Sequence, residues 1–233
     1  KLDRTGISIL YVSPLIALID DQNDRIGEMI RHSNIDLHSW HGDISASKKK
    51  AVLESGTGVL QITPESLENI VNKNYSKVPR LFGNLKYGDK LLSVAGTPYD
   101  TMQEVIGTMG DEETRRSSLI GNGVLYDEVP LLNGTDIDFE TLEKMVDDKT
   151  TMVLIQRSKG YSTRKSLSME TIEKICKIVK SKNPDCICFV DNCYGEFVDN
   201  KEPLEVGADL MAGSLIKNPG GGIVEAGGYI AGK

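Results

Sequence analysis

Three features in the carboxyl-terminal part of the sequence could do chemistry together: an acid, a hydroxyl near a lysine, and a run of glycines. Asp191 ends the apolar run Phe189-Val190, Ser214 stands three residues before Lys217, and glycines follow at 220–222. A lysine amine can form a Schiff base with a carbonyl and then move protons. An acid can keep a ring nitrogen protonated, and hydroxyl and backbone N–H groups can hold a phosphate. Together these residue types are the ones that pyridoxal 5′-phosphate (PLP) chemistry needs.

Each of these residues also has an ordinary structural explanation. A lysine before Asn-Pro-Gly is usually part of a surface turn, and an acid after a buried strand is commonly a helix N-cap. Residue types alone therefore leave both interpretations of Asp191 and Lys217 open.

The elements that must position these residues alternate between strands and helices. Short apolar runs bounded by turn residues predict strands at 7–12, 36–40, 58–63, 90–95, 124–132, 152–156, 187–190 and 208–216. Helical spacing and start signals predict helices from 14 to about 32, from 45, from 64, and at 99–107, 138–147 and 168–182. Asp138 is the predicted N-cap of its helix. This alternation predicts an α/β fold around a mostly parallel sheet, in which Asp191 and Lys217 follow successive strands and could face one cleft.

Composition divides the chain into two unlike parts. Residues 1–87 hold eleven Lys and Arg against ten Asp and Glu, whereas residues 88–233 hold 16 against 24. All three His and the single Trp lie in the first part, and all four Cys lie in the second. Such a shift indicates two segments of different origin, which we interpret as two fused α/β fragments.

Five stretches of the second part carry a family resemblance. They are LFGNLKYGDKLLSVAGTPYDTMQEVIG, MVLIQRSKGYS, CFVDNCYGEF, EVGADLMAGSLIKNPGGG and GGYIAGK. From about Arg80 to Lys233 the sequence resembles the aluminium-resistance or methionine gamma-lyase-like family of fold-type I PLP enzymes. The resemblance implies a carbon–sulfur lyase that acts on an amino acid, in a homodimer that completes the site.

The resemblance also implies roles for individual residues. Lys217 would be the Schiff-base lysine, Asp191 the partner of the pyridine nitrogen and Ser214 a phosphate contact. Gln156 and Arg157 would lie near the cofactor ring or the substrate carboxylate. The family carries, before this region, a Ser-Gly-Thr turn for the phosphate and an aromatic residue that stacks on the ring. A different segment stands in that place here, so we expect half of a PLP site and impaired activity.

The first segment has three motifs at the ends of predicted strands. They are YVSPLIALIDDQ, WHGD and TPESLE. In this order they resemble three motifs of the first motor domain of superfamily 2 DNA helicases, particularly the large helicase-related (Lhr) type. The resemblance implies contacts along a nucleic-acid backbone from Ser13, Gln22, Gly42, Thr63 and Glu65. No G-x-x-x-x-G-K-[ST] phosphate loop occurs in the sequence, so we do not expect ATP hydrolysis.

The two resemblances meet between residues 77 and 89. We therefore predict a helicase-like fragment at 1–82 and a PLP-enzyme fragment at 83–233, joined as a chimera. Three functions stay open at this point: a PLP-dependent lyase, a nucleic-acid-binding fragment without ATPase motifs, and a folded chimera with neither activity.

Other sequence features bear on the cellular compartment of the protein and on membrane and metal binding. No apolar run approaches the roughly 20 residues that span a bilayer, and the first residues do not form a signal peptide. The chain does not begin with Met, which we interpret as a fragment or a processed protein. The four Cys form no C-x-x-C pair, and the three His lack a partner set for a metal. We expect a cytoplasmic protein with buried thiols, no metal and no membrane partner.

Overall fold

The computed structural model describes residues 7–13, 16–55, 57–73, 88–220, 222–223 and 226–232. The contacts within the chain divide it into two compact units. Unit 1 comprises Lys1–Asn84 and Gly213–Lys233, and unit 2 comprises Leu85–Ala212. The boundary predicted between residues 82 and 83 lies outside the described residues.

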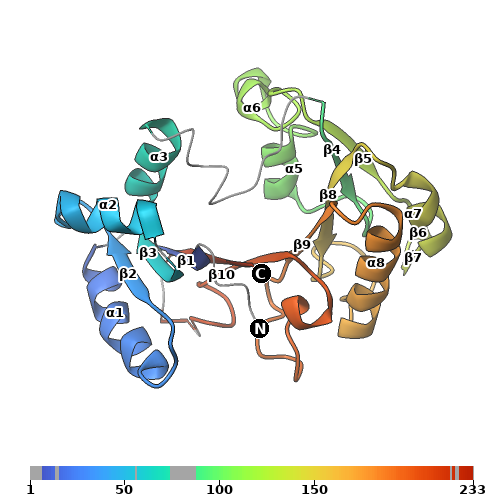
Figure 1. The fold of residues 1–233 in the computed structure, drawn as a ribbon. Helices are drawn as coiled ribbons and strands as arrows, with labels where there is room; N and C mark the ends of the chain where they lie inside the picture. The colour runs from blue at the N-terminus through green and yellow to red at the C-terminus, as the bar shows by residue number, and fades with distance from the viewer. Residues whose placement is uncertain are drawn as a thin grey trace. The chain divides into compact units, whose positions relative to one another are not determined.

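Unit 1 contains a four-stranded arrangement. Its strand order is β2 (Leu37–Trp40), β3 (Gly58–Ile62), β1 (Ile7–Val12) and β11 (Gly228–Gly232). The first three strands are parallel to one another, and β11 runs antiparallel to β1. The helices are α1 (Ile16–Ile30), α2 (Ala46–Ser55) and α3 (Pro64–Lys73) (Figure 1). Their shared core includes Leu10, Trp40, Leu60, Ile62 and Ile70.

Unit 2 is built on parallel strands. Their order is β10 (Leu210–Ser214, of which residues to Ala212 belong to this unit), β9 (Ile187–Asp191), β8 (Thr150–Gln156), β4 (Lys90–Ser93) and β5 (Leu125–Glu128). Every neighbouring pair in this series is parallel. A separate antiparallel pair joins β6 (Leu131–Leu132) and β7 (Asp136–Ile137). The prediction of an α/β fold with a mostly parallel sheet is therefore confirmed.

Helices cover both faces of the strands of unit 2. In Figure 1, α7 (Phe139–Met145) and α8 (Met169–Lys182) lie on one side of these strands, and α5 (Asp100–Ile106) lies on the other. The strand residues alternate accordingly, because successive side chains point to opposite faces. On β8, Val153 and Ile155 join the core that contains Ile172 of α8, whereas Leu154 joins the core of Ile106. Two-sided burial explains why β8 reads as one continuous apolar run.

Some elements differ from their prediction. The predicted strand 124–132 is divided into β5 and β6, with Pro130, which has no N–H to donate to a ladder, between them. Asp138 is the N-cap of α7, as predicted, and accepts a hydrogen bond from the Thr141 N–H. The sequence did not predict α6 (Glu112–Ser117), η1 (Pro203–Val206), β7 or β11.

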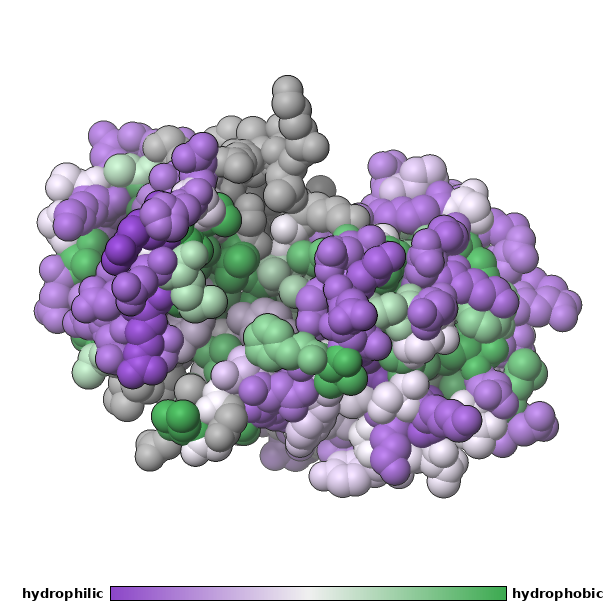
Figure 2. Space-filling view, turned by 90° about the horizontal axis from the view of Figure 1, so that it is seen from below, coloured by the Kyte–Doolittle hydropathy of each residue, from purple (hydrophilic) through white to green (hydrophobic). Residues whose placement is uncertain are grey.

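The surface and the cysteines complete the description. In the view of Figure 2, hydrophilic residues are interleaved with small apolar patches. All four cysteines are buried and free of disulfides. None of the helices in the described parts of the chain has the length and apolar character needed to cross a membrane.

Candidate functional site

The carboxyl ends of the unit 2 strands hold the predicted PLP residues that belong to this unit. Gln156 ends β8, Asp191 ends β9, and the two are paired in the register of these strands. Arg157 follows directly, and its backbone N–H donates to the Asp191 carbonyl at 3.0 Å. Ala212 of β10 pairs with Asp191 on the other side. The structure therefore brings Gln156, Arg157 and Asp191 together at one edge of the sheet, where ligands bind in open α/β folds.

Asp191 is a buried acid with little to neutralise it. Only 4% of its surface is exposed. Its Oδ1 accepts a hydrogen bond from the Cys193 N–H at 3.1 Å, and no cationic side chain pairs with it within the described part of the chain. A buried carboxylate is costly unless it is paired. Asp191 is therefore suited to bind a protonated nitrogen that another molecule supplies.

The Gln156 amide is engaged on both sides. Its Oε1 accepts from the Tyr99 N–H at 3.0 Å, and its Nε2 donates to the Ser158 carbonyl at 3.1 Å. Gly160, with φ of +57°, lies so close that an added Cβ would be 3.0 Å from Nε2. Gln156 thus joins the end of β8 to the loop that follows β4.

Arg157 is buried and its guanidinium is surrounded by acceptors. Nη1 donates to Asn192 Oδ1 at 2.8 Å and to the Gly195 carbonyl at 2.6 Å. Nη2 donates to the Asp199 carboxylate, and Glu202 Oε2 lies 4.0 Å from Nη1. We call Arg157, Asn192, Gly195, Asp199 and Glu202 the arginine cluster. Only unit 2 contributes to it.

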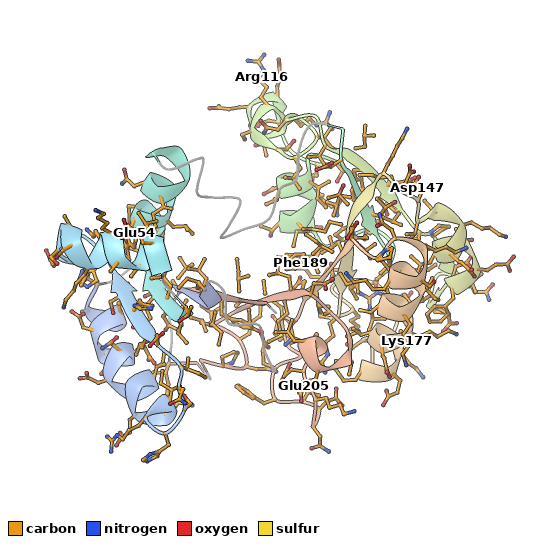
Figure 3. The ribbon with its side chains drawn as sticks, viewed as in Figure 1. Glu54, Arg116, Asp147, Lys177, Phe189 and Glu205 are labelled. Atoms are coloured by element: carbon orange, nitrogen blue, oxygen red, sulfur yellow. The ribbon has the colours of Figure 1, made fainter. Side chains whose placement is uncertain are left out.

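Further hydrogen bonds extend the arginine cluster along the loop. Asn192 Nδ2 donates to Glu202 Oε2 at 2.9 Å, and the Phe197 N–H donates to Glu202 Oε1 at 3.0 Å. The Glu202 N–H in turn donates to Glu205 Oε2 on η1 at 2.8 Å. Figure 3 labels Phe189 on β9 and Glu205 on η1, and the loop lies between them in the chain.

The loop held by this cluster is strained. Tyr194 has φ of +66° and Phe197 has φ of +62°, a left-handed backbone conformation that residues other than glycine rarely adopt. Such conformations cost about 1–3 kcal/mol each and persist only where neighbouring contacts enforce them. Tyr194 and Phe197 are exposed, so their own side chains have little packing to offset the strain. The buried polar contacts of the loop must therefore hold it.

A second buried arginine supports the loop after β8. Arg164 Nη2 donates to the carbonyls of Gln156 and Ser158, at 2.8 and 2.6 Å, and Nη1 donates to the Lys165 carbonyl at 2.9 Å. Its burial lowers the pKa of the guanidinium below its usual value. These acceptors lie at residues 156, 158 and 165 rather than in residues 192–199, which separates the role of Arg164 from that of Arg157.

Ser214 and Lys217 belong to unit 1. Ser214 is the last residue of β10, and the Lys217 N–H donates to the Ser214 carbonyl at 3.4 Å, so the two occupy one turn. Both are half-buried. Along the chain they follow Ala212, the partner of Asp191, by two and five residues. The glycine stretch continues this turn, although residue 221 lies outside the described residues.

The five predicted nucleic-acid residues also lie in unit 1. Ser13 and Thr63 are buried at the carboxyl ends of the parallel strands β1 and β3. Thr63 accepts from the Ser66 N–H and so caps α3. Gly42 and Glu65 are exposed, and Gln22 is half-buried on α1. Ser13 and Thr63 thus lie near each other, since the Ser13 N–H donates to the Ile62 carbonyl at 3.1 Å.

Comparison with known proteins identifies the family. The sequence profile described as methionine gamma-lyase matches residues 67–233, which is more than two thirds of the chain. The chain belongs to the methionine gamma-lyase family. YnbB of Bacillus subtilis, an uncharacterized protein, is 48% identical over 153 residues, which are 66% of this chain and 36% of YnbB.

Solved structures agree with this membership. A carbon–sulfur lyase involved in aluminium resistance from Clostridium novyi is 50% identical and has a TM-score of 0.59. The alignment covers 65% of this chain and 35% of the Clostridium novyi chain. A Listeria monocytogenes protein described as involved in aluminium resistance is 35% identical, with a TM-score of 0.66. The alignment covers 93% of this chain and 57% of the Listeria monocytogenes chain. The matches thus span from about a third to somewhat over half of the relatives.

The Listeria alignment extends well into residues 1–66, which the family profile does not match. Neither that structure nor the profile supports the helicase resemblance of residues 1 to about 80. That resemblance, and the chimera inferred from it, stay predictions.

Sequence reasoning missed four of the five members of the arginine cluster. Asn192 and Gly195 lie within the stretch CFVDNCYGEF, which by itself assigns them no role, and no motif marks Asp199 or Glu202. The one sequence signal for the arginine cluster was Arg157 itself. An arginine directly after an apolar, buried strand needs acceptors for its five N–H groups.

Proposed function

We propose that this chain is part of a PLP-dependent carbon–sulfur lyase that acts on an amino acid. The observation that carries the proposal is Asp191, a buried carboxylate without a cationic partner among the described residues, at the carboxyl edge of a parallel sheet. The family membership and the Clostridium novyi relative support the reaction class.

The residues present suit PLP. Asp191 would pair with the protonated ring nitrogen, which neutralises the buried carboxylate. Ser214, a hydroxyl at a strand end, would donate to a phosphate oxygen, and the glycines after Lys217 allow close backbone approach. When bound, PLP supplies the electron sink for cleavage of bonds at the substrate. We expect the Lys217 amine to hold the cofactor and to move the proton at the substrate α-carbon.

Covalent trapping tests this proposal. The purified chain is incubated with PLP, reduced with sodium borohydride and digested, and the peptides are analysed by mass spectrometry. We expect the phosphopyridoxyl mass on the peptide that contains Lys217, and a visible absorbance band before reduction. The variant Lys217→Ala should lose both signals, whereas Lys159→Ala, at an exposed lysine on the loop after β8, should keep them.

Asp191→Asn extends the same experiment. The amide keeps the size of the side chain but cannot neutralise a protonated ring nitrogen, so PLP should bind more weakly. Labelling spread over exposed lysines, without preference for Lys217, would contradict the proposed function.

A further inference from the structure

Arg157 binds acceptors of its own chain with both terminal nitrogens of its guanidinium. Its two terminal nitrogens reach a side-chain amide, a backbone carbonyl and a carboxylate, all within residues 192–199. Only 4% of the residue is exposed. A guanidinium has five N–H donors in a fixed plane, so these partners also set the orientation of the group. This placement leaves little of the guanidinium for a substrate carboxylate.

Two acceptors of Arg157 flank Cys193, the residue whose N–H orients the Asp191 carboxylate. Asn192 and Gly195 lie on either side of Cys193 and Tyr194 in the chain, and both accept from Nη1. Cys193 in turn donates its N–H to Asp191 Oδ1 at 3.1 Å. The loop that provides this N–H contains two left-handed aromatic residues and would relax if its polar anchors were lost.

We infer that Arg157 is a positioning residue: it holds loop 192–199 in the conformation in which the Cys193 N–H binds and orients the Asp191 carboxylate. This rests on the proposed function as far as the cofactor is concerned, because Asp191 would be aimed at the ring nitrogen. The loop geometry itself does not depend on the cofactor.

Hydrogen–deuterium exchange without PLP tests the geometry. The peptide that contains residues 191–199 is followed in the wild type, in Arg157→Lys and in the control Arg164→Lys. Lysine keeps the charge but cannot bind the amide, the carbonyl and the carboxylate at once. We expect the Cys193 amide to exchange at least about tenfold faster in Arg157→Lys, the effect of losing one hydrogen bond to a charged group. Arg164→Lys should leave it unchanged, because the acceptors of Arg164 among the described residues are the carbonyls at 156, 158 and 165.

A spectroscopic measurement tests the consequence. PLP labelled with 15N in the ring is bound to the same variants, and the nitrogen chemical shift reports protonation. We expect the wild type and Arg164→Lys to give the protonated signal, and Arg157→Lys to shift toward the unprotonated one although Asp191 is intact. A substrate-binding role for Arg157 would leave both the exchange and this signal unchanged, and that result would overturn the inference.

Two further outcomes are also decisive. If Arg157→Lys does not fold, Asp199→Asn takes its place, because this half-exposed carboxylate can be changed with less risk to the core. It should also speed exchange at Cys193, and unchanged exchange would overturn the inference. If the wild type takes up no PLP, the proposed function fails, while the exchange experiment still decides whether Arg157 holds the loop.

Discussion

Replacing Gly195 with alanine tests how closely the arginine cluster is packed. A Cβ built at Gly195 would meet Arg157 Nη1, lie 2.5 Å from Arg157 Cδ and lie 2.6 Å from Asn192 Oδ1. Real Cβ atoms essentially never come within 3.0 Å of such neighbours, so something must move. Both neighbours are buried, and Asn192 is fully so, so neither side chain can turn away without breaking its contacts in the interior.

The cost follows from these contacts. Inserting a methyl group into a packed interior costs about 1–3 kcal/mol. If the guanidinium gives way, it also loses hydrogen bonds worth about 1.5–3 kcal/mol each to a charged group. We therefore expect Gly195→Ala to lower the free energy of unfolding by about 2–5 kcal/mol. Gly42→Ala is the matched control, because nothing lies within 4 Å of a Cβ there. It should stay within about 0.5 kcal/mol of the wild type.

Urea unfolding followed by far-ultraviolet circular dichroism measures the effect. The single tryptophan, Trp40, lies in the core of unit 1, so its fluorescence is a poor probe for this variant in unit 2. A double-mutant cycle with Arg157→Ala isolates the clash, because the truncated side chain no longer meets the new methyl group. We expect a coupling of at least about 1 kcal/mol. Equal costs of Gly195→Ala in both backgrounds, or a cost below about 0.5 kcal/mol, would refute the packing argument.

Two further predictions concern unit 2 away from the cluster. Ile172→Ala removes a fully buried side chain of α8 from the larger core and should cost about 2–5 kcal/mol in the same unfolding experiment, with a smaller loss indicating that the core closes around the cavity. Burial raises the pKa of Asp147, but hydrogen bonds from Thr150 and Lys90 outweigh it and bring the pKa below the usual 3.8. A carboxyl whose pKa is lower in the folded than in the unfolded protein stabilises the fold at pH values above the unfolded-state pKa. This stabilisation is lost as the pH falls through the folded-state pKa. Acid unfolding below about pH 4 should therefore be shallower in Asp147→Asn than in the wild type, and identical pH profiles would contradict the assignment.

Local patterns predicted most of the fold. Continuous apolar runs marked the strands β8 and β9, and the spacing of Ile172, Ile175 and Val179 marked the buried face of α8. These patterns work because burial on two sheet faces or on one helix face demands them. Elements without a hydrophobic pattern were missed. The helix α6 has no buried residue, and β11 contains glycines that weaken a strand signal, so its strand conformation depends on pairing such as that with β1.

The candidate site was predictable only at the level of residue types. Motif resemblance placed Asp191, Lys217 and Ser214 in roles that need a carboxylate, an amine and a hydroxyl, and these roles depend on chemistry that each residue carries by itself. The role of Arg157 depends on its surroundings. A sequence cannot tell whether an arginine after a strand faces a ligand or its own chain, because the acceptors lie 35 to 42 residues further along.

The arginine cluster changes how substitutions around Asp191 should be interpreted. Loss of PLP binding after a change at Arg157, Asn192 or Gly195 would ordinarily be taken as loss of a direct contact. In this structure Arg157 anchors the loop that presents the Cys193 N–H to the Asp191 carboxylate, and Asn192 and Gly195 are the loop residues that accept its hydrogen bonds. The aromatic residues of that loop adopt a conformation they would otherwise avoid, so the free energy stored there must be supplied by the buried polar contacts. A variant that relaxes the loop therefore removes the support that orients the Asp191 carboxylate without contacting that residue. Only a measurement at the ring nitrogen or at the Cys193 amide separates this indirect effect from loss of a direct contact with PLP.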